Sequence, residues 1–148
     1  MRRLPGGYTE GVGGKPDKLR VARAMVEAFA DRDLERLLSL YAADLEFFTR
    51  VTILPERHFS GHDAVREWMA AVDKEYDRYE LIDPEFVAGS GDAVMVTCRL
   101  SLRHRGDSYG QSRTAHWVIR VDEDSGLITG FRSFRDREEA LEAAGLPS

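Results

Sequence analysis

The sequence predicts an α+β fold in which helices cover one apolar face of an antiparallel sheet. The first observation is a change of hydrophobic period, which is helical up to about residue 76 and then becomes two. The second is a set of short turn sequences that separate four strand candidates, so consecutive strands are expected to pair antiparallel. The third is a strand signal over 127–134 that passes, almost without a loop, into a short capped helix.

Length and composition limit the class of protein. A chain of 148 residues fits one domain that buries roughly 70% of its unfolded surface, so its core needs no disulfide or metal. The net charge of −5 argues against a nucleic-acid partner or an anionic membrane surface. No segment approaches the roughly 18 apolar residues of a membrane span, and Cys98 is the only cysteine. We therefore expect a cytoplasmic protein without nucleic-acid or membrane partners.

The first half of the chain is predicted to be mainly helical. Residues 1–16 contain five glycines and two prolines and are expected to form a flexible leader, followed by a single domain over 17–148. Two helices are predicted from Asp17 onward, then a short strand over 44–49 and an irregular stretch to Phe59. Ser60, with Asp63 three residues later, predicts the start of a third helix. Its apolar stripe contains Val65, Trp68, Met69, Val72 and Tyr76.

The second half is predicted to be a meander of four strands followed by a helix. The strand candidates cover 79–88, 92–103, 111–121 and 127–134. Pro84 indicates that the first of them lies at an edge of the sheet, because proline cannot donate to a neighbouring strand. Asp136 and Gly145 mark the ends of the terminal helix, since aspartate caps free N–H groups and glycine adopts the left-handed final position.

Alternation assigns the faces of the two central strands. The apolar face of each is expected to lie against the helices, with Arg113 at one end, and its residues are Val94, Val96, Cys98, Leu100, Leu102, Ala115, Trp117, Ile119 and Val121. His116 lies on the opposite face, and Cys98 is interpreted as inert packing. Composition does not decide which face of the last strand points inward.

The order and spacing of these elements resemble a known family. The stretches that carry the resemblance are 33–44, 60–68 and 91–94, together with the C-terminal strand and helix. They are similar to the nuclear-transport-factor-2-like superfamily, in particular to its SnoaL-like, ketosteroid-isomerase-like branch. The resemblance implies a cone-shaped, curved antiparallel sheet (a cystatin-like roll) wrapped around the N-terminal helices. It also implies a pocket between helices and sheet and a homodimer formed through the convex sheet face. On this basis Thr129, Phe131 and Ser133 are expected to point inward.

The catalytic groups of two branches of this family are absent at the matching positions. For a ketosteroid isomerase, the resemblance places the base at Thr49, a tyrosine near Met25 and a carboxylic acid near Trp117. For a limonene-epoxide-hydrolase-like enzyme, the positions are Cys98, Leu100 and Ser133. Polyketide cyclases of this branch use an aspartate or histidine on the pocket wall. His116 is on the matching strand but on its outward face, which leaves that comparison open.

Two residues remain as candidate catalytic groups. His58 can act as acid or base near neutral pH, and Arg113 can pair with a ligand carboxylate or polarise a carbonyl. The simpler interpretations are a surface loop histidine and a strand-end arginine in solvent. Tyr41 and Tyr76 are interpreted as core residues and His104 as a solvated hairpin residue. The candidate pocket residues, whose aromatic members are equally explained as core, are Phe47, Thr49, Trp68, Trp117, Phe131 and Ser133.

Two functions are compatible with these residues. The leading hypothesis is a SnoaL-like pocket protein that isomerises, cyclises or dehydrates a small hydrophobic or polyketide-like molecule by general acid–base catalysis. The alternative is a non-catalytic ligand-binding or dimerisation module on the same fold. The histidines show no metal-ligand spacing with the carboxylates, so neither a metal nor another cofactor is predicted. Whether the chain is an enzyme stays open.

Overall fold

A computed structural model of the chain describes residues 17–49 and 57–148, apart from the side chains of residues 49 and 57–59. The predicted leader over 1–16 and the stretch over 50–56 lie outside the described residues. The elements, in chain order, are α1 (Lys18–Ala30), α2 (Leu34–Leu40), β1 (Tyr41–Thr49), β2 (Arg57–Ser60), α3 (His62–Glu75), β3 (Tyr76–Ala88), β4 (Ala93–His104), β5 (Gln111–Val121), β6 (Ile128–Phe134) and α4 (Arg137–Ala144).

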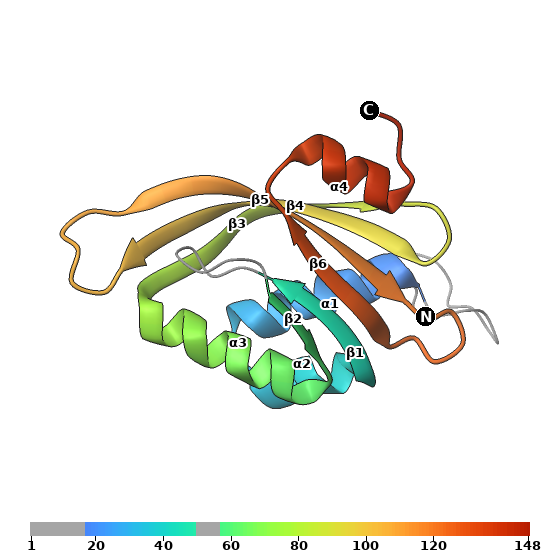
Figure 1. The fold of residues 1–148 in the computed structure, drawn as a ribbon, viewed down its shortest axis with the longest axis horizontal. Helices are drawn as coiled ribbons and strands as arrows, with labels where there is room; N and C mark the ends of the chain where they lie inside the picture. The colour runs from blue at the N-terminus through green and yellow to red at the C-terminus, as the bar shows by residue number, and fades with distance from the viewer. Residues whose placement is uncertain (1–16, 50–56) are drawn as a thin grey trace, which may run out of the picture.

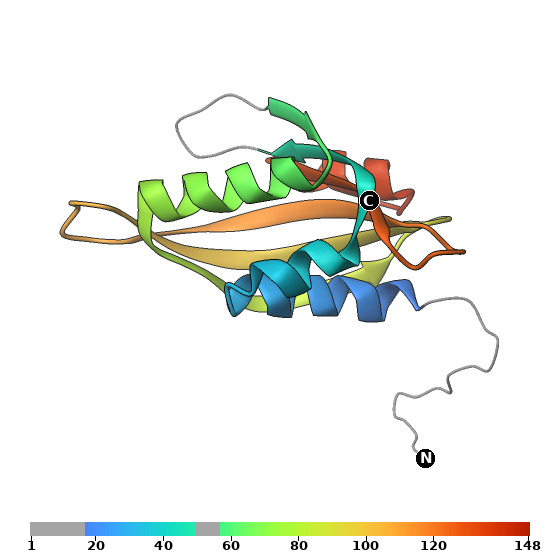
Figure 2. The same cartoon turned by 90° about the horizontal axis from the view of Figure 1, so that it is seen from below.

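The strands form one six-stranded sheet in the order β2-β1-β6-β5-β4-β3. Helices α1, α2 and α3 lie on one side of this curved sheet and α4 on the other (Figures 1 and 2). We call the side of α1–α3 the inner face and the side of α4 the outer face. The α+β prediction is confirmed, and so is the edge position of Pro84, since β3 ends the sheet.

One strand pairing is parallel. The four late strands pair antiparallel as predicted, but β1 runs parallel to β6, with Phe47 opposite Phe131. Parallel strands need a long connection between them, and here α3 and β3–β5 form that connection. The expected all-antiparallel sheet is therefore mixed at this position.

The inner face carries the main hydrophobic core. Alternation identified the inward residues of β4 and β5 correctly, and they pack with the apolar stripes of α1 and α3. In β6 the expected phase holds for Phe131 but not for Thr129. Thr129 is an extra residue between two register pairs, Ile128 with Val121 and Gly130 with Arg120, and this bulge turns Ile128 inward.

The start of α3 differs from the prediction. The capping signature predicts a start at Ser60, whereas residues 57–60 form the edge strand β2 and α3 begins at His62 after the N-cap Gly61. Gly61 has a φ of 78°, and its N–H donates to the carbonyl oxygen of Leu45 at 2.8 Å. This turn from strand to helix needs the left-handed backbone that glycine adopts without strain, and serine does not provide it.

The outer face carries a second, smaller core under α4. Ala140, Leu141 and Ala144 pack against Met95 and Val118 of the sheet. The predicted caps are both present: the Asp136 carboxylate accepts from the N–H of Glu138 at 3.1 Å, and Gly145 is left-handed with a φ of 71°. At its C-terminal end the Ala144 carbonyl accepts from the N–H of Ser90 at 2.8 Å, which fixes α4 to the β3–β4 turn.

Replacement of Gly145 by alanine tests this attachment. A Cβ at Gly145 would lie 2.9 Å from the Cβ of Ser90, closer than carbon atoms approach each other. Gly91 is a matched control, because its φ of 61° is also left-handed but a Cβ there meets no atom within 4 Å. We expect Gly91→Ala to cost about 1–2 kcal/mol of unfolding free energy for backbone strain alone. Gly145→Ala is expected to cost about 1 kcal/mol more by overpacking. Equal losses in urea unfolding would show that α4 does not depend on this contact.

Candidate functional site

A cavity of about 210 Å³ opens on the inner face, between α3 and the strands β3 to β6. It brings together Trp68 from α3, Arg113 and Trp117 from β5, and Ser133 from β6, all of which were predicted as site residues. Ser133 and Trp117 are direct partners across the β5–β6 pair. The remaining lining residues are Tyr79, Leu100, Thr114, Ala115, Phe134 and Arg135.

Phe47 and Phe131, also predicted as pocket residues, lie behind this wall rather than among the lining residues. Phe47 is 1% exposed and Phe131 is 4% exposed. Their rings stack with centroids 4.8 Å apart, and the Phe131 ring lies 5.5 Å from that of Trp117. Trp68 is held on its other side by Phe29 at 4.9 Å. The two tryptophans thus have rigid aromatic support, and their orientation is set by the core.

The polar groups of the cavity are all able to donate hydrogen bonds. Arg113 and Arg135 are exposed arginines, and Tyr79, Thr114 and Ser133 carry hydroxyls. The described part of the lining contains no carboxylate and no imidazole. Burial raises the pKa of the Tyr79 hydroxyl well above its ordinary value, and the positive charge of Arg113 partly opposes that shift. Tyr79 is therefore a neutral phenol at physiological pH.

One buried donor in the cavity wall has no partner. The indole Nε1 of Trp68 is buried and makes no hydrogen bond to any part of the chain that the structure describes. Trp68 as a whole is 7% exposed. A buried N–H without an acceptor costs about 1–3 kcal/mol, so this donor lowers the stability of the fold.

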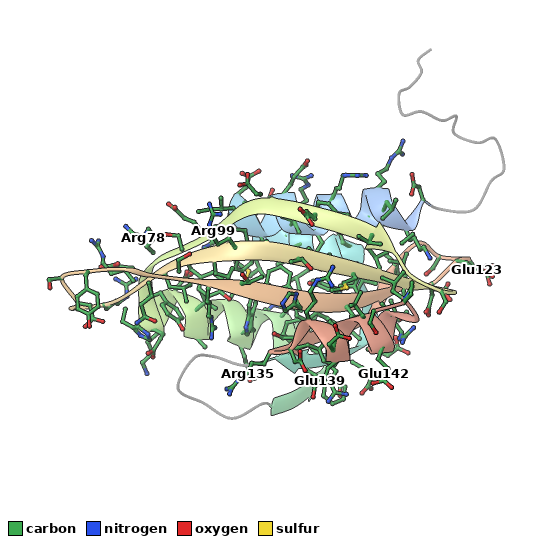
Figure 3. All side chains as sticks on the ribbon, turned by 90° about the horizontal axis from the view of Figure 1, so that it is seen from above. Arg78, Arg99, Glu123, Arg135, Glu139 and Glu142 are labelled. Carbon is green, nitrogen blue, oxygen red and sulfur yellow. The ribbon has the colours of Figure 1, made fainter. Side chains whose placement is uncertain are left out.

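Arg113 and Arg135 differ in their surroundings. Within the described residues, neither forms an ion pair or hydrogen bond. Arg135 also lines a neighbouring groove with Glu139 and Glu142 of α4, and Figure 3 shows these three side chains along the same edge of the molecule. Arg113 lies in the inner cavity, where the described lining includes no acidic residue. Its charge is therefore the one most directly available to a ligand.

Thr49 and His58 are the two predicted site residues whose side chains lie outside the described residues. The backbone of His58 pairs with Phe48, which lines a pocket on the outer face. Thr49 ends β1, one residue beyond the pair of Phe48 with Arg132. The roles suggested for both residues stay predictions.

Among the lining residues that were not predicted as site residues, Tyr79 and Arg135 were each missed for a physical reason. Tyr79 lies on the inward face of β3, opposite Leu102. It was missed because β3 is an edge strand whose mixed polarity gives no clear alternation. Arg135 follows the end of β6, where no periodicity applies. Pairing β3 with β4 would have identified Tyr79, because its partner Leu102 points inward.

A second pocket, of about 310 Å³, lies on the outer face between α4 and β1. It is larger than the inner cavity, but its polar groups are already engaged. Arg120 donates to Asp92 at 2.8 Å and to the Ala143 carbonyl at 3.0 Å. Arg132 lies over the rings of Phe48 and Phe134. We therefore take the inner cavity as the candidate functional site.

Comparison with known proteins gives the family. The model of the SnoaL-like domain matches residues 22–131, which is most of the chain. The chain belongs to the SnoaL-like domain family. This confirms the resemblance drawn from the sequence. No curated protein matches the chain at a significant level.

Solved structures share the fold of this SnoaL-like chain. An NTF2-like protein from Burkholderia thailandensis superposes with a TM-score of 0.67 at 23% identity, covering 88% of this chain and 98% of that one. A protein with a ketosteroid isomerase-like fold from Catenulispora acidiphila, in complex with trimethylamine, gives 0.65 at 18% identity, covering 86% and 93%. TerC co-crystallised with polyporic acid gives 0.61 at 22% identity, covering 86% and 96%. At these identities the likeness establishes the fold.

Cys98 and His104 of the SnoaL-like domain lie outside the described lining of the cavity. Burial raises the pKa of the Cys98 thiol to about 12, so the thiol stays protonated. His104 is not a solvated hairpin residue: its Nδ1 lies 2.8 Å from a Glu75 oxygen and its ring packs on Tyr76.

Among the described residues, no cluster of His, Cys, Asp and Glu has the composition of a metal site. In the same part of the chain, no helix is long and apolar enough to cross a membrane.

His116 lies on the outer face, as alternation predicts, but α4 buries it there, and 7% of it is exposed. Its Nδ1 lies 3.3 Å from the hydroxyl of Thr97. Burial lowers the pKa of His116 below its ordinary value of 6.5; the charge of Arg137 acts in the same direction and that of Asp136 opposes it. The fold therefore favours the neutral imidazole.

This shift predicts a pH dependence of stability. In the unfolded chain His116 binds a proton below pH 6.5, whereas in the folded chain it does so only at lower pH. The contribution of His116 to the unfolding free energy is thus fully present above pH 6.5 and is lost as the pH falls through the interval between the two pKa values. We expect His116→Gln to show a shallower loss of stability between neutral and mildly acidic pH, measured by urea unfolding. Identical slopes for the variant and the original chain would contradict the assignment.

Proposed function

We propose that the chain binds a small, largely apolar molecule in the inner cavity. The supporting observation is the composition of its wall, where Trp68, Trp117 and Leu100 provide apolar surface and a few polar groups converge at the rim. Concave sites in which apolar side chains lie beside a few oriented polar groups are common among small-molecule sites. The polyporic acid complex of TerC, which shares the fold, is consistent with this proposal.

Binding without chemistry is the function that the wall supports best. Isomerisation, cyclisation or dehydration by general acid–base catalysis needs a base within hydrogen-bond reach of the substrate. The described lining offers hydroxyls and guanidinium groups, and these are donors rather than bases at neutral pH.

Catalysis is the second candidate, and one observation favours it. The neutral hydroxyl of Tyr79 and the charge of Arg113 line the same cavity, which is how an enzyme stabilises a developing oxyanion. In that case the base would have to come from a group outside the described lining. The two candidates differ in outcome, because only catalysis converts the bound molecule into a product that chromatography detects.

We also propose a homodimer formed through the outer face, in the cytoplasm. Helix α4 covers the part of this face near β6, and the β4–β5 hairpin extends beyond it (Figure 1). On that uncovered part, Ser112 of β5 is exposed and lies opposite Ser101 of β4. Small side chains on paired strands would allow the sheets of two copies to approach closely.

Filling the cavity tests the binding proposal. The two tryptophans of the chain, Trp68 and Trp117, both line the cavity, so tryptophan fluorescence reports on its occupancy. We expect cyclohexylmethanol, which does not absorb in the tryptophan range, to change the fluorescence of the original chain in a saturable manner. Ser133→Phe should weaken this binding about tenfold or more, because the ring occupies the ligand volume.

The matched control is Ser108→Phe, which places the same ring on the exposed β4–β5 turn and should leave affinity unchanged. Melting temperatures establish that both variants are folded. Unchanged affinity in a folded Ser133→Phe variant would rule out the inner cavity as the binding site.

Light scattering tests the dimer. At micromolar concentration we expect twice the mass of one chain, and a monomer would refute the proposal. Ser112→Arg should give a monomer, because it places an unpaired charge in the proposed interface, which is costly to bury. Ser108→Arg adds the same charge on the turn and should remain dimeric. A dimeric Ser112→Arg variant would exclude this face.

A further inference from the structure

The inner cavity offers donors on every polar group of its wall. The guanidinium groups of Arg113 and Arg135 donate only. The hydroxyls of the lining residues Tyr79, Thr114 and Ser133 can each donate once, although they can also accept. A molecule that carries several acceptors would therefore find donors on these side chains, and the arginines, which cannot accept, favour an acceptor most.

The charges at the cavity also favour a ligand that carries acceptors. The chain carries a net charge of −5, with 26 acidic against 21 basic residues, yet the described residues that line this cavity include two arginines and no acid. Two other arginines on the sheet are paired, Arg103 with Asp77 at 2.8 Å and Arg120 with Asp92 at 2.8 Å. Arg113 lacks such a partner among the described residues, although it extends from a strand in the same sheet.

The cavity wall has a buried, apolar end and an exposed, charged end. Trp117, Ala115 and Leu100 are buried and apolar, whereas Arg113 and Arg135 are exposed. On β5, Arg113 precedes Ala115 and Trp117 by two and four residues, so the three side chains follow one another along the same face. A ligand with an apolar ring and a charged group at one end matches this order.

We propose that the cavity recognises an organic carboxylate, with its apolar ring against Trp68 and Trp117 and its carboxylate held by Arg113. Guanidinium and carboxylate form two parallel hydrogen bonds with matched geometry, which a neutral hydroxyl does not. Arg135 adds a second, weaker attraction, since Glu139 and Glu142 share its neighbouring groove. This inference rests on the proposed function and specifies the class of ligand.

The experiment compares two probes that share a ring and differ in charge. Cyclohexanecarboxylate and cyclohexylmethanol are titrated into the full chain, with tryptophan fluorescence as the readout. We expect the carboxylate to bind about tenfold more tightly, and this preference to fall as salt concentration rises. In Arg113→Gln the preference should disappear, because the affinity for the carboxylate falls far more than the affinity for the alcohol.

Two further variants complete the design. Arg66→Gln removes an exposed arginine of α3 that is paired with Asp63, and it should leave the preference unchanged. Arg113→Lys keeps the charge and should retain part of the preference, which separates charge recognition from a structural role of Arg113.

Each outcome has a distinct meaning. Equal affinities for the two probes in the original chain would overturn the carboxylate inference and leave the binding proposal intact. A preference that survives in Arg113→Gln would overturn the assignment to Arg113. Binding of neither probe would count against the proposed function itself.

Discussion

The stacking of Phe47 on Phe131, with ring centroids 4.8 Å apart, joins the two halves of the chain. Phe47 belongs to the N-terminal part and Phe131 to the last strand, and the parallel β1–β6 pairing places them directly opposite each other. Trp117 packs on Phe131, and Trp68 packs on Phe47 with centroids 5.8 Å apart. Both tryptophans of the cavity therefore depend on this one pair. Loss of either phenylalanine ring would remove the support of the wall as well as buried apolar area.

Burial on both faces of the central strands explains where the sheet departs from simple alternation. Residues 93–96 of β4 and 115–119 of β5 are buried without interruption, because α4 covers the face opposite α1–α3. A strand covered on both sides reads as a continuous apolar run. His116 lies within such a run, and this accounts for its burial without any contact with the inner cavity. A buried titratable group is in this case a consequence of packing.

Local sequence signals predicted much of the fold, and they were reliable where the conformation depends on the type of a single residue. The caps of α4 depend on the conformations of Asp136 and Gly145, which the residue types specify. The parallel pairing of β1 depends on a contact between residues more than 80 positions apart, for which a single sequence carries no local signal. In the site, the residues on regularly alternating strands were found, among them Trp117 and Arg113. Tyr79 and Arg135 were not, because an irregular edge strand and a strand end have no period to read.

The position of Arg113 at the rim also bears on how a charged ligand would reach the cavity. A net charge of −5 repels an anion at long range. Salt screens exposed charges beyond about 8 Å at physiological ionic strength, so this repulsion is weak until the ligand is near the rim. There the nearest charges in the cavity are those of Arg113 and Arg135, and they are attractive. Because Arg113 is exposed, its charge is hydrated in the free protein and carries no large cost of burial. The chain can therefore keep an arginine without an acidic partner at this position, which a fully buried site would not tolerate.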